Sequence, residues 1–346
     1  MGRERETQEF LVPNSRLRRR LKLATAFFYC ALTAAGLARA DEADDLSTAV
    51  VMHIRQHSAA AATLTPADEN RINAFAHYLV KTSYYPANTH DLQAAAISAI
   101  DLSDSTADAG LVTQAALGGM LNSLGHGARF LSTLGGGDAP AADGSLPSAR
   151  DLGALRVVTL PTMSVAGPDA RHTCADFAHL FNLAQTDNIT GFVLDLRGNE
   201  GGALTDSACL AGFFIKNGQL VFNTVNKAGE VVKYQSDASN HKPTNLPVAV
   251  LIDNRTDSGA LLVAAILQTM RHASVIGQQK PNINAAVSSL VFPPGAGRGV
   301  VMPTGEILLA DKHPLASGLH VDVQMAAQDE IAMLNAARPF LARRDD

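Results

Sequence analysis

The sequence has no tryptophan and only three cysteines, and aromatic residues fill 5% of its 346 positions. So few cysteines exclude a small domain held together by many disulfides. None of them stands in a C-x-x-C or histidine-rich context, so we expect no metal site, and we expect no cofactor. Hydrophobic residues make up 47% and charged residues 18% of the chain, which is typical of a globular protein with a large core.

Long apolar runs are also absent. The apolar run from Leu23 to Leu37 is shorter than the roughly 20 residues that a membrane-spanning helix needs. Basic residues between 16 and 22 precede it, and Ala38-Arg39-Ala40 follows. This layout is typical of a signal peptide and predicts cleavage after Ala40, a periplasmic or secreted protein, and no stable membrane span afterwards. The alternative is an uncleaved amphipathic anchor.

An excess of basic residues is missing too. The whole chain has a formal net charge of −5, and loss of residues 1–40 would leave 20 basic and 30 acidic residues, a formal −10. An acidic exported protein without a basic stripe is a poor candidate for binding nucleic acid. Cys30 would leave with the signal peptide. Cys174 and Cys209 would remain, either as a disulfide or as two buried thiols, because pairing depends on geometry.

Helical and mixed patterns divide the rest of the chain. Residues 41–134 are predicted to form an N-terminal helical domain, in which Thr65-Pro66 begins a helix that Pro86 ends. Residues 135–150, rich in glycine and proline, are predicted to be a linker. From 151 to 346, short β-branched runs alternate with helical ones, which predicts an α/β core domain.

Two segments of this core carry candidate chemistry. The first, from Gly191 to Gly202, reads GFVLDLRGNEGG and predicts a buried strand, a glycine-rich turn and a following helix. Backbone N–H groups in such a turn can stabilise a developing negative charge. The alternative is a tight turn in which Asp195 and Arg197 pair for structural reasons.

The second segment, from Val248 to Gln268, also leads from a buried strand into a helix, with Asp257-Ser258-Gly259 at the turn. A serine at a helix N-terminus can present its hydroxyl to a substrate beside amides that stabilise an oxyanion. Asp and Ser are equally the preferred N-cap residues of any helix.

In this order and spacing, the two segments resemble the C-terminal (tail-specific) processing peptidases, serine peptidases with a Ser–Lys dyad on a crotonase/ClpP-like α/β core. The family's D-L-R-x-N-x-G-G turn appears as Asp195 to Gly202, and its serine-rich nucleophile turn matches Asn254 to Ala264 with Ser258 at the middle serine. The resemblance implies that Ser258 is the nucleophile. It also implies that the amides of Gly259 and of Gly201 or Gly202 hold the oxyanion.

The base of the dyad departs from the family pattern. The family's G-K-G-x-x-Q segment falls on residues 282–287, so its lysine is replaced by Ile283 and its glutamine by Val287. Lys280, three positions earlier, is the candidate base if its loop brings it to Ser258, since burial favours the neutral lysine that a base requires.

Four histidines are alternative bases in principle: His241, His272, His313 and His320. Each can equally be an exposed loop residue. His272 lies at the far end of the helix that Ser258 begins, about 21 Å away at 1.5 Å per residue, which excludes a direct hydrogen bond.

The family's PDZ module has no room between Phe130 and Arg156, so we expect no PDZ-type tail recognition. The resemblance implies an exported serine-type endopeptidase that acts on a peptide or protein substrate. The alternative is a catalytically inactive family member that binds a peptide or apolar ligand.

Overall fold

The structure is a computed structural model that describes residues 41–56, 59–131, 147–163, 173–183, 188–238, 241–278, 285–325 and 329–341. The predicted signal peptide, most of the predicted linker, Lys280 and Ile283 lie outside these ranges.

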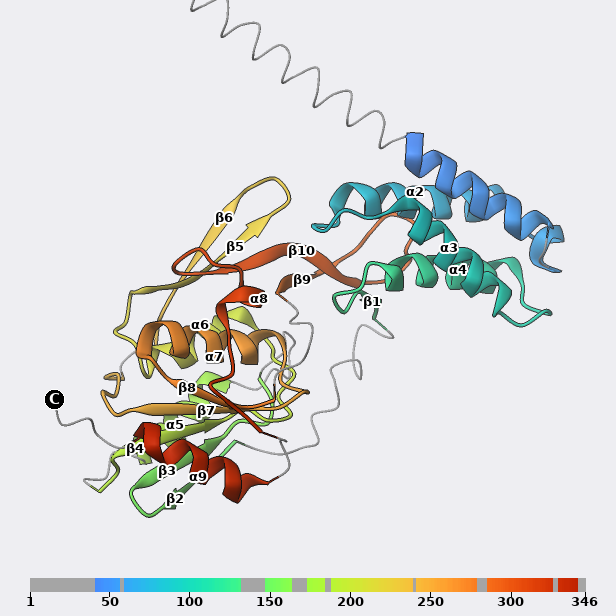
Figure 1. Cartoon of the computed structure of the whole chain (residues 1–346). Helices are drawn as coiled ribbons and strands as arrows, with labels where there is room; N and C mark the ends of the chain where they lie inside the picture. The colour runs from blue at the N-terminus through green and yellow to red at the C-terminus, as the bar shows by residue number, and fades with distance from the viewer. Residues whose placement is uncertain are drawn as a thin grey trace, which may run out of the picture.

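The described residues form helices and strands in both halves of the chain (Figure 1). The helical elements are a helix over residues 41–56, η1 (Ala59–Ala62), α2 (Pro66–Thr82), α3 (Thr89–Asp101), α4 (Ala109–Ser123), α5 (Thr173–Leu183), α6 (Leu204–Gly212), α7 (Ser258–Arg271), α8 (Leu315–Gly318) and α9 (Glu330–Leu341). The strands are β1 (Arg129–Phe130), β2 (Ser148–Leu152), β3 (Leu155–Thr159), β4 (Gly191–Asp195), β5 (Leu220–Asn226), β6 (Val231–Gln235), β7 (Val248–Ile252), β8 (Ser274–Gly277), β9 (Ala286–Val291), β10 (Val300–Leu309) and β11 (Val323–Gln324).

Helix α2 begins where the sequence predicts it and ends earlier. Thr65 is its N-cap and forms a reciprocal capping box with Asp68. The helix stops at Thr82 instead of continuing toward Pro86, because the N–H of Tyr84 donates to the carbonyl of Pro303 in β10 at 3.1 Å and not to a helix carbonyl. A long-range contact therefore ends this helix before the proline does.

The α/β core is built on a mixed six-stranded sheet in the order β11-β8-β7-β4-β3-β2. All neighbours in it are parallel except β2, which pairs antiparallel with β3. A second sheet contains β1, β10, β5 and β6 along one path, with β9 paired to the other edge of β10. The sequence patterns had indicated strands of the first sheet only.

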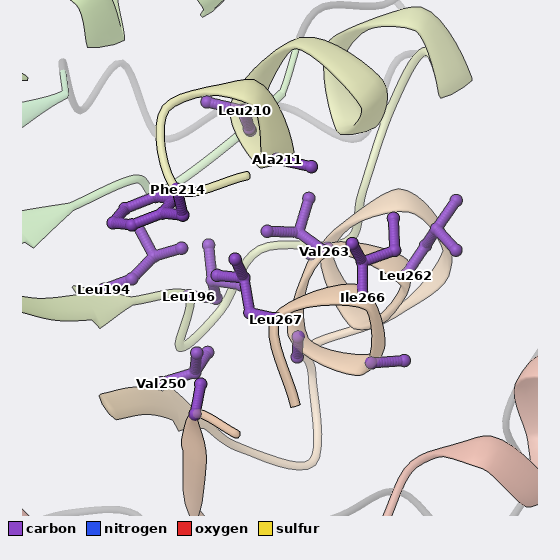
Figure 2. Packing of buried hydrophobic residues seen from close by; sticks show 14 of the residues in the cluster. Leu194, Leu196, Leu210, Ala211, Phe214, Val250, Leu262, Val263, Ile266 and Leu267 are labelled. Atoms are coloured by element: carbon purple, nitrogen blue, oxygen red, sulfur yellow. The ribbon is translucent and has the colours of Figure 1, made fainter. Parts of the chain in front are cut away.

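Both faces of the central strands β4 and β7 are buried. Val193 and Leu251 face α9, and Leu194 and Val250 face α6 and α7. Figure 2 shows Leu262, Val263, Ile266 and Leu267 of α7 packed among side chains of β4, β7 and α6. This packing fixes the N-terminus of α7 relative to the carboxyl ends of both strands.

The helical segment packs on the second sheet. Val300 and Met302 of β10 belong to the same buried cluster as the apolar faces of α2, α3 and α4, and β1 pairs antiparallel with β10. Lys227 donates from Nζ to the carbonyl of Val80 at 3.1 Å. The strands β9 and β10 thus extend from the core toward the helices, as Figure 1 shows. The domain boundary at residues 135–150 stays a prediction.

Cys174 of α5 and Cys209 of α6 form a disulfide, with their Cα atoms 6.1 Å apart. This resolves the alternative that the sequence left open. None of the described helices combines the length and the apolar character that crossing a bilayer requires.

Candidate active site

The glycine-rich turn after β4 is anchored by an ion pair. Asp195 is 3% exposed, and its two carboxylate oxygens accept from Nε and Nη2 of Arg197 at 2.8 and 2.7 Å. These bonds raise the pKa of Arg197, against the opposing effect of partial burial. The pairing of Asp195 with Arg197 that the sequence offered as the structural alternative is therefore present, and this ion pair holds the start of the turn in place.

Asn199 shapes the turn from inside. Its side chain is fully buried; Nδ2 donates to the carbonyl of Leu160 at 2.8 Å, and Oδ1 accepts from the N–H of Gly201 at 2.9 Å. Gly201 has φ +92°, a conformation that side-chain-bearing residues rarely adopt. The turn thus combines a buried amide anchor with a residue that has to be glycine.

The second turn leads from β7 into α7. Asp257 is the N-cap, and its Oδ1 accepts from the N–H of Ser258 at 2.9 Å. Ser258 is the first residue of α7 and has φ +49°. A positive φ outside glycine is uncommon and strained, and it persists only where surrounding contacts enforce it.

The two turns touch each other. A Cβ atom added at Gly201 would lie 2.6 Å from the N atom of Gly259 and 2.8 Å from Cβ of Ser258, so only glycine fits. A Cβ at Gly259 would lie 3.3 Å from the N atom of Gly202. The structure therefore brings together Ser258 and all three glycines that the sequence singled out.

The arrangement leaves backbone donors available beside the serine. Within the described residues, no hydrogen-bond acceptor is found for the N–H of Gly202 or of Gly259. The N–H of Ser258 is occupied by Asp257. Two amides from different turns next to one serine hydroxyl are what an oxyanion site for acyl transfer requires.

Among the described residues, no candidate base is found hydrogen-bonded to the hydroxyl of Ser258. Lys280 lies outside them, and Val287, at the family's glutamine position, is a half-buried residue of β9 that packs against the core. In the part of the chain that the structure describes, no hydrogen bond to the hydroxyl of Ser258 is found.

Two of the alternative histidines have acidic partners. His320 pairs with Asp322 at 3.2 Å and His313 with Asp311 at 3.1 Å, and both side chains are about 70% exposed. The N–H of His320 also donates to Gln268, which stands ten residues along α7 from Ser258, about 15 Å at the helical rise.

The other two histidines, His272 and His241, occupy positions that cap a helix or pack against an aromatic ring. His272 is the C-cap of α7, at the end of the helix opposite to Ser258. The imidazole of His241 lies against the ring of Phe213, with ring centroids 5.1 Å apart.

Two residues of the site were not predicted. Asp253 and Thr256 join the two turns through side-chain hydrogen bonds. The D-x-x-T spacing is a local signal for a capped turn, but their partners Leu196 and Gly198 lie far back in the sequence, so the pattern alone could not reveal the link. No cluster of three or more metal-ligating side chains occurs among the described residues.

Comparison with known proteins finds similarity in the part of the chain that contains both turns. Residues 154–325 match the model of peptidase family S41. The α/β core belongs to this family. Over 97 residues, the chain is 34% identical to a carboxy-terminal-processing protease from Bartonella bacilliformis, a match that covers 27% of this chain and 21% of that protein.

Further relatives are similar over equally limited lengths. The chloroplastic carboxyl-terminal-processing peptidase 2 of Arabidopsis thaliana is 30% identical over 116 residues, which cover 34% of this chain and 22% of that protein. The chain thus matches about a fifth of the length of these two curated relatives.

Solved structures extend the likeness beyond the core. A lipoprotein from Streptococcus agalactiae has a TM-score of 0.57 at 15% identity and covers 80% of this chain and 97% of its own. A putative peptidase from Parabacteroides merdae has a TM-score of 0.57 at 16% identity, with 81% of this chain and 98% of that chain covered. At such identities the likeness concerns the fold alone.

Proposed function

We propose that this S41 family member is an exported serine-type endopeptidase that hydrolyses peptide bonds in a peptide or protein substrate. The observation that carries the proposal is the meeting of the two turns, which sets Ser258 beside the amides of Gly259 and Gly202, for which no acceptor is found among the described residues. Ser258 attacks the scissile carbonyl, and the amides of Gly259 and of Gly201 or Gly202 stabilise the oxyanion.

Gly201 and Gly202 differ in whether their N–H groups are available. The N–H of Gly201 already donates to Oδ1 of Asn199 at 2.9 Å. Gly202 is therefore the better partner for Gly259. The developing oxyanion would also lie at the N-terminus of α7, whose 14 residues supply a favourable dipole there.

Lys280 is the base in this proposal. A serine hydroxyl is a weak nucleophile at neutral pH unless a base takes its proton. Lys280 follows β8 by three residues, and Gln278, two residues before it, donates its N–H to the carbonyl of Ile252 at 3.3 Å. Its loop thus starts from the same sheet edge as the turn of Ser258.

The alternative is an inactive family member that binds a peptide or apolar ligand at the same turns. It is favoured by one observation, the presence of Ile283 and Val287 at the family's lysine and glutamine positions. The two proposals make opposite demands on a hydrolysis assay.

The test is hydrolysis of an unstructured protein substrate by the mature chain and by Ser258→Ala, Lys280→Ala and Lys312→Ala. We expect the first two variants to fall to the same low residual rate, since residues that act as one unit are not additive. Lys312, in the exposed turn after β10, is the matched control and should retain activity. A wild-type chain without any hydrolysis would favour the inactive alternative.

Export is a separate part of the proposal. The charged, apolar and A-x-A sequence of residues 16–40 motivates it. We expect the protein recovered from outside the cytosol to begin at Asp41 by N-terminal mass spectrometry. Recovery of only the intact chain, in the cytosol, would contradict it.

A further inference from the structure

A single carboxylate oxygen links the two turns of the site. Oδ1 of Asp253 accepts from the N–H of Gly198, in the glycine-rich turn, at 2.9 Å. The same oxygen accepts from the N–H groups of Arg255 and Thr256, in the nucleophile turn, at 3.0 Å each. Gly198 and Asp253 are 55 residues apart in sequence, so this oxygen holds together two segments that local chain geometry does not.

Thr256 makes the reciprocal connection. Its side chain is fully buried, and its hydroxyl oxygen accepts from the N–H of Asp253 at 2.9 Å. The one hydroxyl proton has two acceptors within reach, the carbonyl of Leu196 at 2.9 Å and Oδ1 of Asp253 at 3.0 Å. Leu196 directly precedes the glycine-rich turn, so this bond also crosses between the turns.

The oxyanion site needs this link because its two donors come from different turns. The amide of Gly202 follows the first turn and that of Gly259 follows the second. A third cross-turn bond, from the N–H of Asp257 to the carbonyl of Asn199 at 3.0 Å, lies one residue before the strained Ser258. A backbone strained at a functional site persists only when neighbouring contacts over-determine it.

We propose that Asp253 is a positioning residue for the reaction. Its Oδ1 fixes the distance between the amides of Gly202 and Gly259 and holds Ser258 in its strained conformation, without touching substrate. This inference rests on the proposed function, since it concerns the same serine and the same amides.

The test compares two substitutions at one position. Asp253→Ala removes the acceptor, whereas Asp253→Asn keeps an oxygen at Oδ1 and removes the charge. For Asp253→Ala we expect kcat for peptide hydrolysis and the rate of Ser258 phosphonylation to fall about 100-fold, the lower end of the loss caused by removing one oxyanion donor. KM should stay within about twofold, and Asp253→Asn should restore most of kcat, because the acceptor and not the charge positions the turns.

Asp104 provides the matched control. Its Oδ1 accepts from both the N–H and the hydroxyl of Thr106 at 2.8 Å, the same local capped turn, but in the helical segment away from the site. Asp104→Ala removes similar local bonds and should leave kcat and phosphonylation unchanged. A similar loss of kcat in both alanine variants would assign Asp253 a merely structural role and overturn the proposal.

Hydrogen–deuterium exchange separates this inference from the proposed function. In Asp253→Ala, amides in a peptide covering residues 196–203 should exchange faster, and in Asp253→Asn they should not. If Asp253→Ala fails to fold, Thr256→Val, which removes one hydroxyl at nearly constant volume, should produce the same local exchange change and the same selective loss of kcat.

If wild type neither cleaves nor labels, the proposed function has failed, and with it the catalytic consequence, while the exchange data still decide whether Asp253 couples the turns. Unchanged exchange and unchanged kcat in Asp253→Ala would contradict the inference even in an active enzyme.

Discussion

At the scale of single residues, the site depends on positions where no other side chain fits. Gly201 is the sharpest case, because its φ is +92° and an added Cβ would overlap the backbone of Asp257 and Gly259 and the side chain of Ser258. The sequence predicted a glycine-rich turn there, and the positive φ is the conformation that makes glycine necessary in it. The overlap with the second turn was not predictable, since it joins segments more than 50 residues apart.

Gly201→Val should therefore lose both stability and reactivity. The positive φ alone costs about 1–3 kcal/mol, and the overlap must push the two turns apart. We expect a lower midpoint in urea unfolding and no phosphonylation of Ser258. Gly229→Val is the matched control: Gly229 has φ +81° with nothing within 4 Å of an added Cβ, so it should lose stability from strain alone and keep the labelling. Equal labelling of both variants would remove Gly201 from the oxyanion site.

At the scale of elements, the junction between the helical segment and β10 is held by polar contacts as well as apolar packing. The hydroxyl of Tyr84 donates to Oε2 of Glu306 at 3.1 Å, next to the backbone bond to Pro303 that ends α2. Burial, followed by the bond to Glu306, raises the pKa of Tyr84 above its ordinary value of 10.0. The neutral phenol is thus favoured in the folded protein.

This shift predicts a pH dependence with a definite sign. A group whose pKa is raised by folding stabilises the fold fully below its unfolded pKa, and that contribution is lost as the pH rises through the raised value. Between pH 8 and about 10.5, the melting temperature of wild type should therefore fall further than that of Tyr84→Phe, because the variant has no phenol at this position to ionise. Tyr85, whose pKa is raised mainly by burial and also by Glu306 and Tyr84, titrates in both proteins, and burial and Glu306 act on it in both. Equal losses in both would show that the Tyr84 contact does not stabilise the junction.

Elements differed in how far the sequence predicted them. Helix α2 was readable because Thr65, Pro66 and Asp68 are local start signals, and β4 and β7 because uninterrupted apolar runs suit strands buried on both faces. The second sheet was not readable. Strand β6 is almost wholly exposed, and β10 contains Pro303 and Gly305 at a register shift against β9, so neither presents a strand pattern, and both depend on partners distant in sequence.

At the scale of the whole molecule, the family resemblance gave the fold class and the two turns, and the S41 match over residues 154–325 confirms the family. The roles of Ser258 and Lys280 remain predictions, because the first depends on reactivity and the second on a residue outside the described structure. The link through Asp253 and Thr256 could not be predicted, since hydrogen bonds between distant turns exist only once both strands lie in one sheet.

The most direct test of the account is covalent labelling of Ser258 in the folded mature chain by a serine-directed phosphonylating probe. Mass spectrometry of the digested protein should locate one adduct on Ser258, absent from Ser258→Ala and from protein labelled in denaturing urea, because the reactivity comes from the assembled turns. Absence of an adduct from the folded wild-type protein, or an equal adduct after unfolding, would contradict the claim that these turns form a serine peptidase site.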